Sequence, residues 1–210
     1  MSDAIRLNSD FSDFYDYKFS ANGEYVYNRI KNKESKLESL KYLRNIGVRT
    51  IQIKPVSKFV RGIDSEKVVV YTDINSHGPN DKIICSGQEA LMEFPNYLGS
   101  NYIEFTGGKS IKVVHIGKRI FQVIMQNNNP DSLEHGKVIS ISEVQSGISF
   151  NIREPIYSID YIPIGNIPIA TDLNSVQQLD KLGLQRLISA DEVYEEVNRA
   201  MLLYGIIRKG

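Results

Sequence analysis

Two stretches in the second half of the chain constrain its fold most, because each consists of two strand-length apolar runs joined by a tight turn. The segment SIKVVHIGKRIFQVIMQ, residues 110–126, turns at Gly117 and Lys118. The segment IYSIDYIPIGNIPIATDLNS, residues 156–175, turns at Gly165 and Asn166. Glycine-containing turns between β-branched runs are typical of antiparallel hairpins. We therefore predict a mostly antiparallel sheet after residue 100.

Three helices are predicted from apolar spacing and from residues that begin or end helices. The first lies in SKLESLKYLRN and ends at Gly47, a residue common at helix C-caps. The pairs Ser86 with Glu89 and Ser189 with Glu192 form S-x-x-E capping boxes, which open a short second helix and a last helix. The last helix has an apolar face made of Val193, Val197, Ala200, Met201 and Tyr204.

Further strands are predicted in RTIQIKP, KVVVYTD, KIIC, NYIEF, KVISIS and ISFNI, with the polar loop INSHGPND between the second and third. The order of elements implies an α+β fold in two lobes. We expect an N-terminal entry segment over residues 1–32, a small α/β lobe over 33–100, and a larger antiparallel-sheet lobe with a C-terminal helix over 101–210. A cleft between the lobes is the natural place for a ligand.

The composition is that of a globular protein, with 41% apolar and 24% charged residues. Its 25 basic residues balance its 25 acidic ones, so the chain has no net field for nucleic acid or an anionic membrane, and neither is expected as a partner. The single cysteine, Cys85, follows two isoleucines and is interpreted as a buried thiol. The lone cysteine, an N-terminus without the features of a leader, and the lack of a long apolar run predict a cytoplasmic location.

The hairpin at residues 156–175 allows two registers with different consequences. In a regular ladder across a two-residue turn, Asp160 pairs with Thr171 and Asp172 points to the opposite face. A connection with an odd number of residues, which sets Ile162 opposite Ala170, pairs Asp160 with Asp172 instead.

The second register is favoured because it separates polar from apolar side chains. It places Ser158 opposite Asn174 on a polar face, and it leaves Ile159, Tyr161 and Leu173 together on the other face.

Two carboxylates opposite each other in this register call for a positive charge between them. Their Cβ atoms would be about 5 Å apart, which destabilises the pair unless a cation intervenes. Carboxylate and amide oxygens are preferred ligands of Mg²⁺, which often completes its shell with water and phosphate oxygens. Asp160, Asp172 and Asn174 are therefore candidate metal ligands. The alternative is a solvated sheet face whose acids are neutralised by nearby lysines.

Taken in order, these segments resemble the ATP-grasp fold of carboxylate-amine ligases such as D-alanine ligase and glutathione synthetase. The resemblance covers about residues 33–205, and its most specific element is the D-x-N step of Asp172 and Asn174 with Asp160 upstream. It implies that ATP and Mg²⁺ bind between the lobes, under a flap formed by TDINSHGPNDK. The substrate-binding domain that usually precedes this unit is expected to be absent, since only residues 1–32 stand in its place.

The resemblance also assigns roles to residues. Lys36 matches a phosphate-contacting lysine, and Glu104 matches the acid of the hinge strand that holds adenine. Asp160, Asp172 and Asn174 take the metal positions. No catalytic residue is assigned.

Three positions depart from the family pattern. Tyr71 stands where a lysine usually reaches the adenine and the α-phosphate, Ser110 where an acid meets the ribose, and Ser158 where several ligases have a basic residue. The departures at Tyr71 and Ser158 remove positive charge on which phosphoryl transfer relies. Cations that could replace this charge in space are Lys82, Lys109, Lys112, Lys118 and Arg119.

The candidate nucleotide-binding residues are Lys36, Tyr71, His77, Glu104 and Lys112. His77 is either a phosphate contact of the flap or a loop residue without a special task. His115 is interpreted as a packed histidine of a strand rather than a base. The acidic and aromatic run within FSDFYDYKF either lines a substrate pocket or packs against a sheet edge or a partner.

These expectations lead to two hypotheses. The first is an ATP-dependent, Mg²⁺-requiring ligase that converts a carboxylate of a small molecule or peptide to an acyl phosphate and joins it to an amine or similar nucleophile. The second is a catalytically degenerate relative that acts as a nucleotide-binding or structural interaction module. A homo-oligomer is left open.

Overall fold

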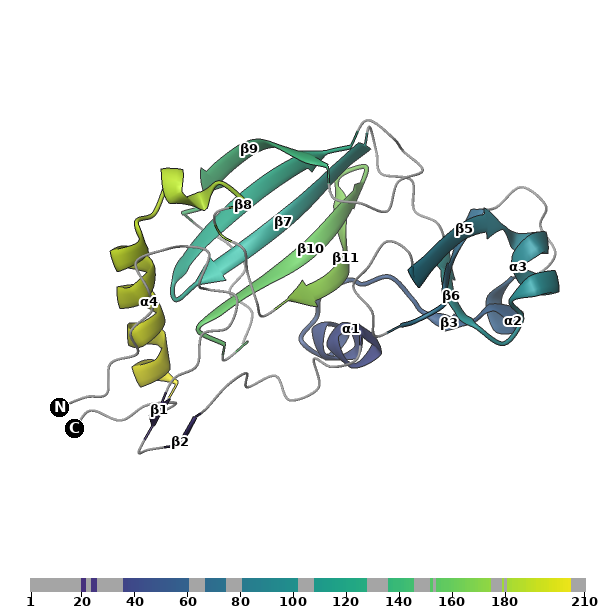
Figure 1. Cartoon of the computed structure of the whole chain (residues 1–210), viewed down its shortest axis with the longest axis horizontal. Helices are drawn as coiled ribbons and strands as arrows, with labels where there is room; N and C mark the ends of the chain where they lie inside the picture. Colours follow the sequence, from purple (N-terminus) through teal and green to yellow (C-terminus); the bar gives the residue numbers. More distant parts are fainter. Residues whose placement is uncertain are drawn as a thin grey trace.

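The computed structural model of the chain describes residues 20–21, 24–25, 36–60, 67–74, 81–101, 108–127, 136–145, 152, 154–174, 179 and 181–204. Two antiparallel sheets and their helices make up most of these residues, and Figure 1 shows the sheets side by side with helix α1 (Lys36–Asn45) near their border. The predicted α+β class is confirmed. The short strands β1 (Ser20–Ala21) and β2 (Glu24–Tyr25) form a separate antiparallel pair.

The smaller sheet has four strands in the order β3-β6-β4-β5. These are β3 (Lys54–Pro55), β4 (Lys67–Tyr71), β5 (Lys82–Ser86) and β6 (Leu98–Asn101), and the helices α2 (Val56–Phe59) and α3 (Gly87–Glu93) belong to the same lobe. Its core comprises Val56, Val68, Val70, Cys85 and Ala90. The predicted buried state of Cys85 is thus confirmed, and so is the cap of α3, because the Ser86 hydroxyl accepts a hydrogen bond from the Glu89 amide at 3.2 Å.

The larger sheet has five strands in the order β11-β10-β7-β8-β9, all antiparallel. The strands are β7 (Lys109–Ile116), β8 (Arg119–Gln126), β9 (Lys137–Glu143), β10 (Ile156–Ile164) and β11 (Ile167–Asn174). Ile116 pairs with Arg119 and Ile164 with Ile167, which confirms both predicted hairpins. In each turn the glycine has a φ of +57°, a conformation that glycine adopts without steric cost.

Both faces of the larger sheet are covered, but by different helices. One face packs on helix α4 (Ala190–Leu203) and the 3₁₀ turn Leu184–Arg186, with Phe121, Ile156 and Met201 among the fully buried side chains. The opposite face packs on α1 through a second cluster that includes Leu43, Ile159 and Leu173. The alternation along each strand therefore divides the sheet into two cores.

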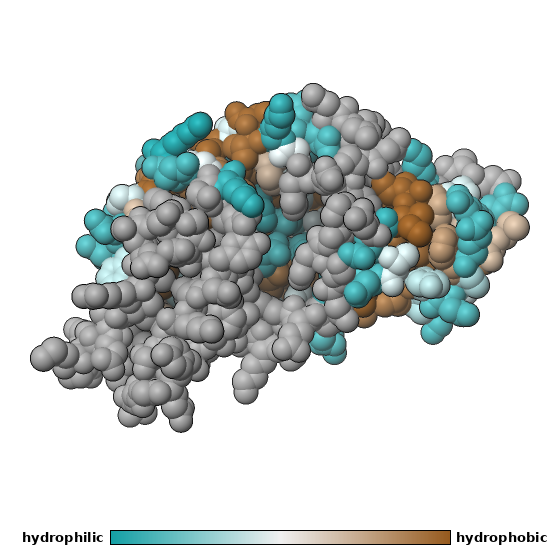
Figure 2. Space-filling model, in the orientation of Figure 1, coloured by the Kyte–Doolittle hydropathy of each residue, from teal (hydrophilic) through white to brown (hydrophobic). Residues whose placement is uncertain are grey.

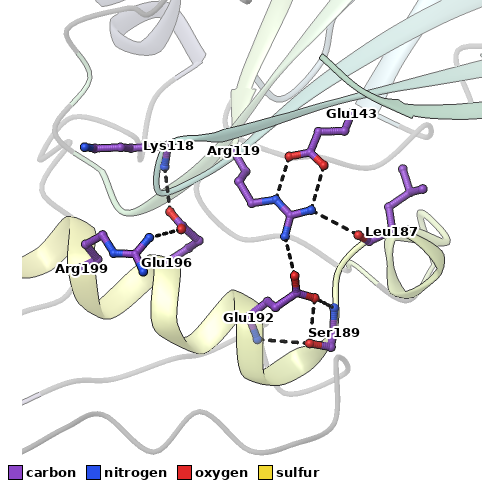
Figure 3. Close-up of polar contacts among 8 residues, drawn as sticks. All are labelled: Lys118, Arg119, Glu143, Leu187, Ser189, Glu192, Glu196 and Arg199. Carbon is purple, nitrogen blue, oxygen red and sulfur yellow. Dashed lines mark hydrogen bonds and ion pairs between the residues drawn. The ribbon is translucent and has the colours of Figure 1, made fainter. Parts of the chain in front are cut away.

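Helix α4 begins at the predicted capping box and is tied to the sheet by ion pairs (Figure 3). Ser189 accepts a hydrogen bond from the Glu192 amide, and the Glu192 carboxylate accepts one from the Ser189 amide. Arg119 of β8 makes a bidentate contact with Glu143 of β9 at 2.7 and 2.8 Å, and its third nitrogen donates to Glu192 at 2.9 Å. One guanidinium thus connects two strands with the first turn of α4.

Some predicted strands differ from the structure. RTIQIKP is not a continuous strand: Thr50 forms a single parallel bridge with Ala170, and regular strand structure is confined to Lys54–Pro55. Pro55 ends the strand and leads directly into α2, because proline has no amide hydrogen to continue a ladder. Beyond Asn101, NYIEF lies outside the described residues, and so does nearly all of ISFNI.

Within the described residues, no helix is long and apolar enough to cross a membrane. Apolar surface is nevertheless visible over the small lobe and near β9 (Figure 2). Met92 on α3 and Ile139 on β9 are exposed by 75% and 51%.

Candidate functional site

The hairpin of β10 and β11 combines a two-residue turn with a β-bulge. Across Gly165 and Asn166 the ladder is regular as far as the pair Tyr161 and Ala170. Thr171 is then an extra residue of β11, and its hydroxyl donates to the Asp160 carbonyl at 3.2 Å. Such a bulge shifts the pairing by one residue, so that Asp160 lies opposite Asp172.

The outcome of the register prediction is therefore mixed. The pairs Asp160 with Asp172 and Ser158 with Asn174 are confirmed. The odd-numbered connection is wrong, and so is the pairing of Ile162 with Ala170, because Ile162 pairs with Ile169. The extra residue is in the strand rather than in the turn.

Side chains from β7, β10, β11 and α1 meet at this pair of acids, in what we call the polar cluster: Lys36, Lys112, Ser158, Asp160, Asp172 and Asn174. One Asp160 oxygen accepts a hydrogen bond from the Asn174 amide at 3.0 Å, and the other lies 2.5 Å from the Lys112 ammonium. Lys112 also donates to the Ser158 hydroxyl at 3.4 Å. The Asp172 carboxylate lies 3.5 Å from the Lys36 ammonium.

The polar cluster is mostly buried. Ser158 is 0%, Asp160 7% and Lys112 8% exposed. The side chains of Lys36 and Asp172 are 10% and 18% exposed. Lysines do neutralise the acids, as the alternative interpretation supposed, but the face is not solvated. Burying this many charges is costly unless they are paired, so the arrangement indicates a site rather than an ordinary sheet surface.

Lys36 lies in the first turn of α1, and the position of α1 is fixed by the way the helix ends and by the segment that follows it. Gly47 has a φ of +88° and its amide donates to the Arg44 carbonyl at 3.0 Å, which ends the helix as predicted. The chain then runs along β11, where Ala170 exchanges hydrogen bonds with Arg49 and Ile51. Because this segment fixes α1 beside β11, Lys36 in its first turn reaches Asp172.

The three departures from the family pattern are all buried. Tyr71 is 6% exposed, and its hydroxyl lies 3.3 Å from the Ser100 hydroxyl. Ser110 is 8% exposed. Ser158 is next to the Lys112 ammonium, so a cation from the neighbouring strand β7 lies where the sequence of β10 provides none.

Lys82, which sequence analysis named only as a cation that could replace missing charge, lies near the polar cluster. It lies directly opposite Tyr71 in the β4–β5 ladder. Its ammonium is close enough to Lys36, Asp172 and Asp160 for their charges to act on it. Burial and the Lys36 charge lower the pKa of Lys82, while the carboxylates oppose that shift. The sequence alone could not place Lys82 near the site, because its position depends on the pairing register of β4 and β5 across the loop that joins them.

The other candidate cations and histidines lie elsewhere. Lys118 and Arg119 belong to the contacts with α4 shown in Figure 3, and Lys109 begins β7 on an exposed position. His115 is 5% exposed and stacked on Tyr157, with ring centroids 4.3 Å apart, in agreement with a packed histidine. His77 and Glu104 lie outside the described residues.

The residues of the polar cluster fit a metal ion that arrives together with phosphate. Asp160, Asp172 and Asn174 provide the hard oxygen donors that Mg²⁺ prefers. Among the described residues, no three His, Cys, Asp or Glu side chains are grouped so as to hold a metal alone. Each carboxylate also has a lysine beside it, so an incoming cation needs new anionic partners for the displaced ammonium groups. The metal site stays a prediction.

A cavity of about 480 Å³ lies on the other side of the large sheet, away from the polar cluster. Ile111, Val113, His115 and Tyr161 line it, together with the turn at residues 166–168. This mostly apolar lining does not suit a polyphosphate.

The geometry described so far is that of a two-lobed α+β protein with a buried, charged cluster where the lobes meet. Comparison with solved structures defines the fold further. The ATP-grasp ligase PsnB, solved in complex with a minimal precursor, matches with a TM-score of 0.54 and 9% sequence identity, covering 82% of this chain and 62% of its own. The chain therefore has the ATP-grasp fold, as its resemblance implied.

Two further similar structures are D-alanine-D-alanine ligases. The enzyme from Helicobacter pylori has a TM-score of 0.49 and 11% identity, over 80% of this chain and 58% of its own. The enzyme from Bacillus anthracis, in complex with ATP, has a TM-score of 0.47 and 14% identity, over 84% and 68%. No family model matches the sequence, and no curated protein does.

Proposed function

We propose that the chain binds a Mg²⁺ complex of ATP between its two lobes and uses it to activate a carboxylate for attack by an amine or a similar nucleophile. The observation that carries this proposal is the buried polar cluster, in which two carboxylates, an amide and two lysines converge at the border of the lobes. The ATP-grasp fold supports it, since the similar structures belong to ligases of this kind.

In the proposed reaction, an oxygen of the substrate carboxylate attacks the γ-phosphorus of ATP and the bond to ADP breaks. The nucleophile then attacks the carbonyl carbon of the acyl phosphate, phosphate leaves, and the nitrogen loses a proton to give an amide. A bound Mg²⁺ would neutralise phosphate charge and would be held by Asp160, Asp172 and Asn174. Lys36 and Lys112 would exchange their carboxylate partners for phosphate oxygens and keep the transferred group in position.

The donor carboxylate is proposed to belong to a small molecule or a peptide. PsnB was solved with a minimal precursor, and the D-alanine ligases act on amino acids by name.

The first experiment is isothermal titration of the chain with MgATP, followed by an assay of ADP release over a panel of carboxylates and amines. Asp172→Asn should weaken MgATP binding by tenfold or more while the far-ultraviolet circular dichroism stays the same, because the variant keeps the shape and loses the charge. Glu143→Gln is the matched control, since it makes the same change at an ion pair with Arg119 far from the polar cluster.

The second candidate function is a nucleotide-binding module without turnover. It is favoured by Tyr71 and Ser158, two buried neutral residues at positions where ligases of this family have cations. MgATP binding with no ADP release over the panel would support this candidate. Unchanged MgATP affinity in Asp172→Asn would contradict both candidates.

A further inference from the structure

We propose that Lys82 is a phosphate-binding residue of the nucleotide site and replaces, from the neighbouring strand, the cation that position 71 lacks. The inference rests on the proposed function and adds a residue to it. Three observations support it: the pairing of Lys82 with Tyr71 in the small sheet, the face of the sheet to which the Lys82 side chain points, and the charged residues around its ammonium.

The ladder places Lys82 and Tyr71 on one face of the small sheet. The two residues are a direct pair of β4 and β5, and directly paired residues of an antiparallel ladder point to the same side. Val68, Val70 and Cys85 point to the other side, where they form the core with Ala90 of α3. Lys82 and Tyr71 therefore face away from the helices of the small lobe.

This face is turned toward the polar cluster. Besides the neighbouring Asp81, the charges that act on Lys82 are those of Lys36, Asp172 and Asp160. These three residues belong to α1, β11 and β10. The ammonium of Lys82 is thus the contribution of the small sheet to a site otherwise made by α1 and the large sheet. A ligand that contacts both Lys82 and Asp172 has to lie between the two sheets.

The immediate surroundings of Lys82 leave its charge available to a ligand. Lys112 and Lys36 each lie within 4 Å of a carboxylate, whereas no ion pair among the described residues involves Lys82. A partly buried ammonium that forms no direct ion pair is unfavourable, and phosphate oxygens would provide one. The compact ammonium of lysine suits a phosphate as a point charge.

Position 71 itself cannot supply this charge. Tyr71 is buried and its hydroxyl is engaged with Ser100 of β6. A cation at position 82 instead of position 71 stays on the same face of the sheet, because directly paired residues point to the same side. The Cβ atoms of such a pair are only about 5 Å apart.

The test compares MgATP affinity, by isothermal titration, in wild type, Lys82→Met and Lys67→Met. Methionine keeps most of the length of the lysine stem and removes the charge. Lys67 is the matched control, since it lies on the same face of the same sheet at the other end of the β4–β5 ladder. We expect Lys82→Met to weaken MgATP binding at least tenfold, and Lys67→Met to stay within twofold of wild type.

A relocation variant makes the test specific. Tyr71→Lys in the Lys82→Met background returns a cation to the same face, and it should recover a large part of the lost affinity. Lys82→Gln provides a second neutral variant if Lys82→Met does not give the wild-type circular dichroism spectrum.

The outcomes separate this inference from the function on which it rests. A folded neutral variant at position 82 with MgATP affinity within twofold of wild type would overturn the role of Lys82 and leave the proposed function standing. Equal weakening in Lys67→Met would also overturn it, because the effect would then be one of general charge. No binding of MgATP to wild type would overturn the proposed function, and the role of Lys82 with it.

Discussion

Lys112 and Asp160 are two charges held 2.5 Å apart with little access to water, since both residues are less than a tenth exposed. In such a pair the Coulomb attraction largely offsets the cost of removing both charges from water. The pair is thus expected to contribute little net stability, although the loss of one member leaves the other buried without compensation.

This asymmetry gives a prediction for unfolding by urea. Asp160→Asn should lower the free energy of unfolding by about 3 kcal/mol, because the Lys112 ammonium stays buried without its partner. The double variant Lys112→Met with Asp160→Leu should recover most of that loss. Losses that simply add in the double variant would contradict the explanation.

His115 predicts a dependence of stability on pH. Burial lowers its pKa to about 4 from the usual 6.5, so the folded chain keeps it neutral while the unfolded chain binds a proton. The free energy of unfolding contributed by His115 is therefore fully present above pH 6.5 and is lost as the pH falls toward 4. Between pH 7 and pH 5 the loss should be about 2 kcal/mol.

The measurement is urea unfolding of wild type and His115→Phe at these two pH values. Phenylalanine keeps an aromatic ring against Tyr157 and cannot be protonated. The variant should lose less stability than wild type on going to pH 5. The same loss in both proteins would assign the pH dependence to other groups.

Among the elements, α4 shows how a single side chain can connect parts distant in the chain. Arg119 contacts Glu143 and Glu192 and donates to the Leu187 carbonyl just before the helix (Figure 3). Its guanidinium also lies over the ring of Phe121, at 5.2 Å from the centroid. Arg199 pairs only with Glu196 of its own helix among the contacts in Figure 3.

Thermal unfolding should distinguish these two arginines. Arg119→Met should lower stability by about 1 kcal/mol, a modest value because Glu143 and Glu192 are more than a third exposed. Arg199→Met should have no measurable effect, since an exposed pair within one helix contributes little. The difference should shrink at high salt. Equal effects of the two substitutions would show that Arg119 does not secure α4.

The hairpins and caps could be predicted because their signals lie within a few residues. Gly117 and Gly165 mark turns, and Ser86 and Ser189 mark helix starts, through contacts that the local backbone makes by itself. The bulge at Thr171 could not be predicted, because no glycine or proline is adjacent to it, and Pro168 lies three residues earlier within the regular part of the ladder. Its effect on the pairing of Asp160 with Asp172 was nevertheless anticipated from the separation of polar and apolar side chains.

At the scale of the whole molecule, the proposed function predicts that the polar cluster couples the binding of ATP to that of Mg²⁺. The lysines already compensate Asp160 and Asp172, so Mg²⁺ alone would have to displace ammonium groups into a poorly hydrated site. Phosphate oxygens would give these ammonium groups new partners. The two ligands should therefore bind with positive cooperativity, which by linkage is reciprocal.

This coupling can be measured by thermal shift. Mg²⁺ alone should leave the melting temperature nearly unchanged, and Mg²⁺ with ATP should raise it more than the sum of the separate effects. In isothermal titration, saturating ATP should tighten Mg²⁺ binding about tenfold or more. A melting temperature raised equally by Mg²⁺ alone would mean that the lysines do not restrict the metal site.

Near-neighbour patterns in the sequence were sufficient for the α+β class, the two large hairpins, the helix ends and the three oxygen-bearing residues of β10 and β11. Each of these follows from turn chemistry, capping or alternation within a short segment. Only the tertiary structure determined where each lysine lies. Helix α1 brings Lys36 to Asp172, β7 brings Lys112 to Asp160, and β5 places Lys82 beside Tyr71. These residues are far apart in the chain, and their distances depend on how sheets and helices pack, which no local pattern encodes.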